Sequence, residues 1–266
     1  MTKNMKIKDI SDRLLTIKEP NDPFLDQCKM DDRKGVSDLL LKWKKSYQKE
    51  LQLQNVFKQM CTNEIELRKQ GYSVVAGIDE VGRGPLAGPV VACAVVLPED
   101  FYCPGLTDSK QLSETKRNHF YEIIRDQAVA IGTGIIDNGE IDKINIYEAT
   151  KKAMLTAITN LGIMPDYLLI DAMRLEVPVP QLSIIKGDSK SISIAAASIM
   201  AKVTRDRMMK EYAVQYPHYA FEKNMGYGTK AHLEGLDQFG ITPWHRRSFS
   251  PVKEMSERNK TNGFRM

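Results

Sequence analysis

The stretch that decides the fold runs from Val74 to Gly88 and reads Val-Val-Ala-Gly-Ile-Asp-Glu-Val-Gly-Arg-Gly-Pro-Leu-Ala-Gly. Its opening, from Val74 to Ile78, has the apolar pattern of a buried strand, and the adjacent acids Asp79 and Glu80 follow directly. Burying carboxylates is costly unless something pairs with them, and a divalent cation would do so. The next glycines allow close backbone approach, and the arginine between them suits a phosphate. The stretch therefore predicts phosphodiester chemistry.

The pattern on both sides of this stretch predicts an α/β domain over residues 71–249. Apolar runs rich in β-branched residues predict strands, and helical spacing of apolar residues predicts helices. Strands are expected at 73–78, 89–97, 129–136, 167–170 and 182–185, and helices at 113–127, 145–161 and 191–216. Interleaved strands and helices indicate a mixed sheet flanked by helices.

The first 70 residues differ, because they contain no strand candidate. Pro20 to Pro23 interrupts a short first helix, and a long helix is expected over residues 37–69. Lysines at 42, 44, 45 and 49 make that helix basic, and Trp43 and Tyr47 lie among them. Residues 1–70 are thus a small all-helical N-terminal extension, whose basic face is either solvated or a substrate-binding appendage. Residues 250–266 are expected to be a disordered basic tail.

Composition narrows the class of protein. The chain has 266 residues, of which 42% are hydrophobic, enough for a sizeable core. No apolar run approaches the roughly 18 residues of a membrane span, and the lysine-rich start lacks an apolar signal core. The four cysteines show no Cys-x-x-Cys spacing, so they are expected to be reduced thiols without zinc. These features predict a cytoplasmic protein with no membrane association, and a monomer is the default expectation.

The net charge of +4 conceals an uneven distribution. Residues 1–70 carry 15 basic and 11 acidic side chains, residues 71–244 carry 17 and 21, and residues 245–266 carry 6 and 2. An acidic centre between two basic ends suits a metal-dependent enzyme acting on a polyanion. Offsets of this size are also ordinary, so the distribution supports that interpretation without deciding it.

Two further acids follow apolar strands. Asp171 ends the run Tyr-Leu-Leu-Ile, and Asp188 follows Ile-Ile-Lys-Gly. Ligands of α/β sheets bind at the carboxyl ends of the strands, so these acids are expected to meet Asp79 and Glu80 there. Four carboxylates without histidine favour two Mg²⁺ or Mn²⁺ ions. Taken singly, Asp188 could instead cap the following helix, and Asp171 could be a turn residue.

These motifs resemble those of ribonuclease HII, the bacterial type 2 ribonucleases H. The resemblance covers residues 71–249 and rests on motifs that occur in the family's order. They are Gly77 to Pro89, Asp108-Ser109-Lys110, Asp171-Ala172, Lys186-Gly187-Asp188, Ile194 to Ile199, Ala201-Lys202-Val203, Arg205-Asp206 and Gly226 to Thr229. The chain departs from the many family members that lack an extension like residues 1–70.

The resemblance implies a ribonuclease H-like fold and a metal-dependent endonuclease. The implied catalytic and metal-binding residues are Asp79, Glu80, Asp171 and Asp188. The implied activity hydrolyses the RNA strand of RNA–DNA hybrids and nicks duplex DNA on the 5′ side of a single embedded ribonucleotide. It leaves a 3′-hydroxyl and a 5′-phosphate, which is the first step of ribonucleotide removal.

Substrate recognition has its own candidates. To distinguish ribose from deoxyribose, a protein must sense a 2′-hydroxyl, and the resemblance assigns that role to the turn Gly82-Arg83-Gly84. It also implies that Tyr227 stacks on the neighbouring sugar, and Lys110 could hold a phosphate. His218, His232 and His245 are expected to be structural, and Arg205 is expected to pair with Asp206.

Two rival functions remain open at this point. One is a non-catalytic module that binds RNA–DNA hybrids, although a polyanion binder gains nothing from clustered carboxylates. The other is a different two-metal nuclease of the same fold, such as a junction resolvase, which would lack selectivity for a 2′-hydroxyl.

Overall fold

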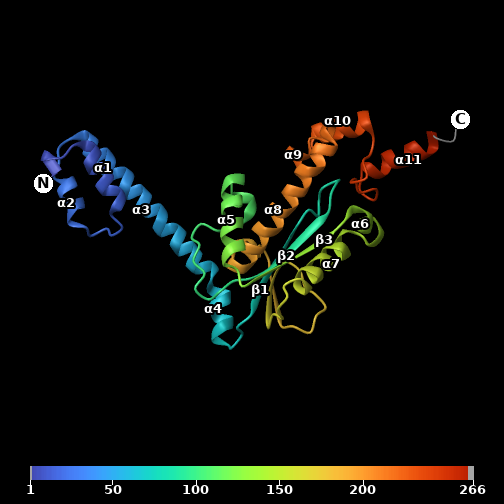
Figure 1. Cartoon of the computed structure of the whole chain (residues 1–266), viewed down its shortest axis with the longest axis horizontal. Helices are drawn as coiled ribbons and strands as arrows, with labels where there is room; N and C mark the ends of the chain where they lie inside the picture. The colour runs from blue at the N-terminus through green and yellow to red at the C-terminus, as the bar shows by residue number, and fades with distance from the viewer. Residues whose placement is uncertain (1, 263–266) are drawn as a thin grey trace. The chain divides into compact units, whose positions relative to one another are not determined.

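Strand β1 (Val75–Val81) lies at the centre of a five-stranded sheet in the computed structural model, which describes residues 2–262 (Figure 1). The strand order is β3-β2-β1-β4-β5, with β2 at Val90–Val96, β3 at Ala130–Ile136, β4 at Tyr167–Asp171 and β5 at Gln181–Ile184. The pairs β1–β2 and β2–β3 are antiparallel, whereas β1–β4 and β4–β5 are parallel. The predicted mixed sheet is therefore confirmed.

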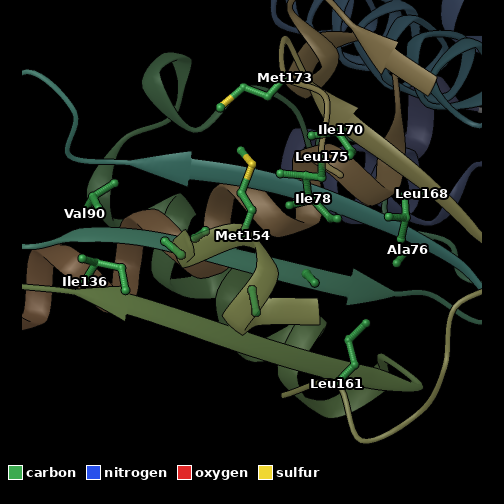
Figure 2. Close-up of a cluster of buried hydrophobic side chains, with 14 of the residues drawn as sticks. Ala76, Ile78, Val90, Ile136, Met154, Leu161, Leu168, Ile170, Met173 and Leu175 are labelled. Atoms are coloured by element: carbon green, nitrogen blue, oxygen red, sulfur yellow. The ribbon is translucent and has the colours of Figure 1, made fainter. Parts of the chain in front are cut away.

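Helices cover both faces of this sheet. Helix α7 (Ile146–Thr159) covers one face and α8 (Ile192–Gln215) the other. Helices α5 (Glu114–Gln127) and α9 (Phe221–Asn224) pack on α8, α6 (Asn138–Ile144) packs on α7, and α10 (Lys230–Phe239) follows α9 in the chain. Short 3-10 turns lie at η2 (Ser109–Gln111), η3 (Gly187–Ser189) and η4 (Pro217–Tyr219). Helix α7 buries its alanines and Met154 against Ala76, Ile78 and Leu168, in the core that Figure 2 shows. Helix α8 packs on β1 and β2, with Ile194 against Val75 and Leu169.

The N-terminal unit has a small core of its own. It contains η1 (Thr2–Asn4), α1 (Ile7–Thr16), α2 (Pro23–Lys29) and the start of α3 (Lys34–Met60). The buried side chains are Ile10, Leu14, Phe24, Leu25, Cys28, Val36 and Leu40. Arg33 closes this unit by donating hydrogen bonds to the carbonyls of Thr2 and Met5 and pairing with Asp31, whose pKa it lowers. Of the two prolines that predicted a break, Pro23 starts α2, where Asp22 caps the helix.

The helical extension ends differently from the sequence prediction. Instead of one helix over residues 37–69, the structure has α3 and then α4 (Thr62–Lys69), with Cys61 between them. The chain divides into two compact units between Lys58 and Gln59, so α4 belongs to the unit that contains the sheet. A domain boundary at residue 70 therefore does not coincide with the division between the compact units.

The C-terminal segment also differs from prediction. The sequence predicts disorder over residues 250–266, whereas α11 occupies Val252–Asn262 and Val252 is fully buried. The apolar cluster that includes Leu86 and Met209 covers Val252, which explains the order. The remainder of the predicted tail, residues 263–266, lies outside the described residues. Within residues 2–262, no helix combines the length and the apolar character that crossing a membrane requires.

Candidate active site

The acids Asp79 and Glu80 lie within β1 rather than just beyond it. The antiparallel neighbour β2 continues alongside them, pairing Asp79 with Cys93 and Glu80 with Ala92, so the strand runs to Val81. Asp79 is 5% exposed, and its Oδ1 accepts a hydrogen bond of 2.7 Å from the backbone N–H of Glu80. The strand thus carries a carboxylate into the interior, which an isolated apolar-run pattern does not anticipate.

The parallel register brings Asp171 to the same level of the sheet. Ile78 on β1 pairs with Ile170 on β4, so Asp79 and Asp171 occupy the next positions of neighbouring strands. Asp171 Oδ1 accepts a hydrogen bond of 2.7 Å from the N–H of Gly187, at the start of η3. That bond places the turn carrying Asp188 next to the end of β4. Asp188 does not cap α8, because Ser191 does.

The electrostatics show that these carboxyl groups share one region. Burial raises the pKa of Asp79 well above its ordinary value, and the charges of Glu80 and Asp171 raise it further. Burial also raises the pKa of Glu80, against the opposing effect of Arg83. For Asp188, burial followed by the charges of Asp108 and Asp171 raises the pKa to about 6. Crowded, buried carboxylates of this kind are what a cation would stabilise in their charged form.

The donor chemistry fits a hard divalent cation. Within residues 2–262, no three His, Cys, Asp or Glu side chains are arranged so that they could hold a metal ion as they stand. Nevertheless, Glu80 Oε2 is buried without a hydrogen-bond partner, which leaves a carboxylate oxygen unsatisfied. The neighbouring donors are all carboxylate oxygens, the ligands that Mg²⁺ and Mn²⁺ prefer. The set Asp79, Glu80, Asp171 and Asp188 therefore suits such an ion after side-chain adjustment.

The turn after β1 takes a conformation that only glycine tolerates well. Gly82 has a φ of +95°, and a Cβ there would lie 2.3 Å from Nε of Arg205 and 2.7 Å from the carbonyl oxygen of Pro89. Arg83, at the tip, keeps a side chain that is 45% exposed, with Nη1 3.4 Å from Glu80 Oε1. The turn is thus closely packed where Gly82 faces Arg205 and Pro89, and exposed to solvent at Arg83.

Two buried arginines bind backbone carbonyl groups in and around this turn. Arg246 donates to the carbonyls of Gly82 (2.5 Å), Arg83 (2.9 Å) and Gly88 (two bonds, 2.9 and 3.0 Å). Arg205 donates to three further carbonyls, those of Pro89 (2.9 Å), Ala87 (3.0 Å) and Met225 (2.9 Å). Both arginines are fully buried, and burial lowers their pKa values, to about 9 for Arg246 and about 10 for Arg205.

These contacts correct one prediction and reveal residues that sequence reasoning missed. Arg205 does not pair with Asp206, because Asp206 accepts from Lys202 at 2.8 Å. A signal for Arg205 existed, since it follows Ala201 by one helical turn on the buried face of α8. Arg246 lies in an irregular segment, where no periodicity marks a buried face.

Tyr227 lies beside the glycine turn. It is 46% exposed, and a Cβ added at Gly84 would lie 3.5 Å from its ring carbon Cε1. The two turns are joined directly, because the N–H of Leu86 donates to the carbonyl of Gly226 at 2.8 Å. The structure therefore brings the candidate residues for sugar recognition together.

Lys110 approaches the carboxylates from another segment. Its Nζ lies 4.0 Å from Asp188 Oδ2, with the side chain 80% exposed. Asp108, which the sequence analysis did not select as a site residue, caps η2 by accepting from the N–H of Lys110. Ser198 of α8 was also missed; its Oγ lies 3.0 Å from Ser109 Oγ, and its hydroxyl opposes the rise in the pKa of Asp79.

Two of the three selected histidines form a buried pair away from the carboxylates. His232 Nε2 and His245 Nε2 are 2.9 Å apart. The other ring nitrogen of His232 contacts the carbonyl of Tyr227, and that of His245 accepts a hydrogen bond from the N–H of Thr242. Burial lowers the pKa of both, to about 3 for His245. His218 stacks on Phe239 instead. None of these contacts involves the candidate carboxylates.

Comparisons with known proteins match nearly the whole chain to a single family. A family model described as Ribonuclease HII matches residues 76–252, and one described as Ribonuclease HII N-terminal domain matches residues 6–68. Ribonuclease HII of Bacillus cereus (strain B4264) is 56% identical over 254 residues, covering 96% of this chain and 99% of that protein.

Solved structures show the same fold. Ribonuclease H2 from Pyrococcus horikoshii OT3 superposes with a TM-score of 0.59 at 29% identity, covering 71% of this chain and 99% of that one. Bst-RNase HIII in complex with Mn²⁺ has a TM-score of 0.55 at 18% identity, with 73% and 72% coverage, and shows likeness of fold alone.

Proposed function

Because the chain belongs to the ribonuclease HII family, we propose that it is a metal-dependent endonuclease that nicks duplex DNA 5′ of embedded ribonucleotides. Membership makes the chain a ribonuclease that acts on RNA–DNA hybrids. Cleavage at a single ribonucleotide, with 3′-hydroxyl and 5′-phosphate products, is the finer part of the proposal. One observation carries it: Asp79 and Asp171 occupy corresponding positions of neighbouring strands, and β1 leads from Asp79 and Glu80 into the turn of Gly82 to Gly84.

The carboxylates would hold the metal. Asp79, Glu80, Asp171 and Asp188 supply oxygen donors, and the unpartnered Oε2 of Glu80 needs a positive partner. When bound, a divalent cation supplies positive charge and Lewis acidity at the scissile phosphate. The fold relative Bst-RNase HIII was solved in complex with Mn²⁺, which supports Mn²⁺ here, and Mg²⁺ prefers the same oxygen donors.

The turn would read the sugar. Its backbone groups at Gly82, Arg83 and Gly84 can approach a 2′-hydroxyl because glycine presents no side chain. The buried Arg246 fixes the direction of the carbonyls at Gly82 and Arg83, so the backbone geometry of the turn is preorganised. Tyr227, next to Gly84, would stack on the adjoining deoxyribose and disfavour a second 2′-hydroxyl.

Two further groups would contact phosphate. Arg83 is half exposed above the turn, and Lys110 is exposed beside Asp188, so each can reach a backbone oxygen. Each also screens a carboxylate before substrate binds, because Arg83 lowers the pKa of Glu80 and Lys110 lowers that of Asp188.

The test uses a labelled DNA duplex with one ribonucleotide beside an all-DNA duplex of the same sequence, in Mg²⁺, Mn²⁺ or EDTA. We expect one metal-dependent cut 5′ of the ribonucleotide and no cut in the control. Cleavage of both duplexes would favour a nuclease of the same fold without sugar selectivity. Binding in EDTA without turnover in either metal would favour the non-catalytic binding module. Action as a monomer in the cytoplasm stays a prediction.

A further inference from the structure

Helix α4 is bonded to the first turn of α8 through a buried carboxylate. Glu64 is 2% exposed, and its Oε1 accepts hydrogen bonds from Ser191 Oγ (2.5 Å) and from the N–H of Ser193 (3.0 Å). Beside it, Asn63 Nδ2 donates to the carbonyl of Lys190 at 3.2 Å. Glu64 and Asn63 fall in the region that matches the N-terminal family model, outside the catalytic one.

A short series of hydrogen bonds leads from Glu64 to the candidate carboxylates. The hydroxyl of Ser191 donates to Glu64 and caps α8 by accepting from the N–H of Ile194. The N–H of Ser191 donates to the carbonyl of Gly187 at 2.8 Å, and the N–H of Gly187 donates to Asp171 Oδ1 at 2.7 Å. Asp188 lies in the turn that these bonds close.

The same turn touches β1 on its other side. A Cβ at Gly77 would lie 2.1 Å from the carbonyl carbon of Ser193 and 2.4 Å from the nitrogen of Ile194. The backbone of α8 therefore rests directly on the strand, two residues before Asp79. Glu64 on one side and the strand on the other leave the start of α8 little freedom.

Holding this turn does not by itself require a charged side chain. Glu64 Oε2 is buried without a hydrogen-bond partner, so the carboxylate carries a desolvation cost that a neutral acceptor would reduce. The helix N-terminus offsets part of this cost, because its dipole favours a negative group. The contacts of Glu64 are therefore those of a hydrogen-bond acceptor for the start of α8, a role that a neutral acceptor could also fill.

We propose that Glu64 is a positioning residue that sets the η3–α8 turn and thereby the placement of Asp188 and Asp171. Helix α4 then acts on the active site through the start of α8, without touching substrate. The inference rests on the proposed function in that it takes these carboxylates as the metal-binding groups. Groups bonded directly to metal ligands typically change metal affinity or activity by about 10–100-fold when removed. Glu64 acts through Ser191 and Gly187, so the lower end of that range is expected.

The test compares full-length Glu64→Ala and Glu64→Gln with Glu66→Ala, which alters an exposed glutamate on the same helix. Mn²⁺ binding is titrated calorimetrically, the Mn²⁺ half-saturation and kcat of cleavage are determined, and amide exchange over residues 187–193 is measured without metal. Thermal unfolding confirms that each variant is folded.

We expect Glu64→Ala to weaken Mn²⁺ binding by about 10-fold or more and to speed exchange at Gly187 and Ser193. Glu64→Gln keeps an acceptor for Ser191 and should restore most of the affinity, and Glu66→Ala should match wild type. A lower unfolding temperature with unchanged Mn²⁺ affinity and exchange would overturn the proposal. If Glu64→Ala does not fold, Ser191→Ala breaks the same link and is judged by the same outcomes.

The exchange experiment separates this inference from the proposed function. Wild type that fails to cut the ribonucleotide duplex would refute the function, whereas the metal-free exchange at Gly187 would still report on Glu64. Unchanged exchange in Glu64→Ala, alongside normal cleavage by wild type, would refute only the positioning role.

Discussion

The substitution Arg246→Lys tests whether a buried guanidinium holds the turn that reads the sugar. In the structure, Arg246 makes four hydrogen bonds to three carbonyls, those of Gly82, Arg83 and Gly88. A guanidinium presents five donors in a rigid fork, whereas an ammonium is a single point on a flexible stem. Lysine would therefore keep a hydrogen bond to one of the three carbonyls and leave the other two without a donor.

The expected loss of stability follows from the number of carbonyls that lose their partner. A buried polar group that loses its partner costs about 1–3 kcal/mol, so two carbonyls cost about 2–6 kcal/mol. The space left by the guanidinium can admit a water, which places the expected loss in the lower part, about 2–4 kcal/mol. For a domain of this size the unfolding temperature should fall by about 4–16 °C. A typical stability of about 5–15 kcal/mol leaves the variant folded at 25 °C.

The functional consequence should be lost discrimination rather than lost chemistry. Releasing the carbonyls of Gly82 and Arg83 loosens the groups proposed to sense the 2′-hydroxyl, while the carboxylates on β1 and β4 keep their positions. We expect the ratio of cleavage rates, ribonucleotide duplex over all-DNA duplex, to fall at least tenfold, about 1.4 kcal/mol. Urea unfolding and paired cleavage assays measure the two effects.

The matched control is Arg247→Lys, because Arg247 is the exposed neighbour of Arg246. Its stability should stay within about 0.5 kcal/mol of wild type. The reasoning fails if the free energy of unfolding of Arg246→Lys also lies within about 0.5 kcal/mol of wild type and the variant retains full discrimination between the two duplexes.

Three further predictions concern the site itself. Asp79→Asn and Asp171→Asn should each abolish cleavage, and an active variant would contradict the metal assignment. The unfolding temperature of Asp79→Asn in EDTA should rise above that of wild type, because the change removes a buried carboxylate that its neighbours repel. Tyr227→Ala should weaken the preference for an RNA-to-DNA junction, read from the cleavage pattern of a substrate with several consecutive ribonucleotides; an unchanged pattern would refute the stacking role. The pKa of Asp188 is about 6 in the folded chain against an ordinary 3.8, so the native state binds more protons between these values and wild-type stability falls as pH rises from about 4 to 6. Asp188→Asn in EDTA should show a smaller decline than wild type, because the raised pKa values of Asp79 and Glu80 remain. The prediction is wrong if urea unfolding at pH 4 to 7 gives the variant and wild type the same change of stability with pH.

The local pattern predicted much of the fold. Buried strands such as β2 and helices such as α5, with its Ser113 cap, follow from the spacing and chemistry of neighbouring residues. The two parallel pairings were not predicted from that spacing, and they bring Asp171 level with Asp79. The length of β1 was also misjudged, because pairing with β2 extends the strand through Glu80.

The sequence alone determined which residue types are present for the chemistry: strand-associated acids, a glycine-flanked arginine and a tyrosine between glycines. Only the tertiary structure decided how they are supported. Arg205, Arg246 and Glu64 look like ordinary charged residues in the sequence, yet each is buried and bonded to groups far along the chain. Burial and long-range hydrogen bonding depend on which segments pack together. The helical period marks at most the buried face on which Arg205 lies, and no local pattern reveals its carbonyl partners or the burial of Arg246 and Glu64.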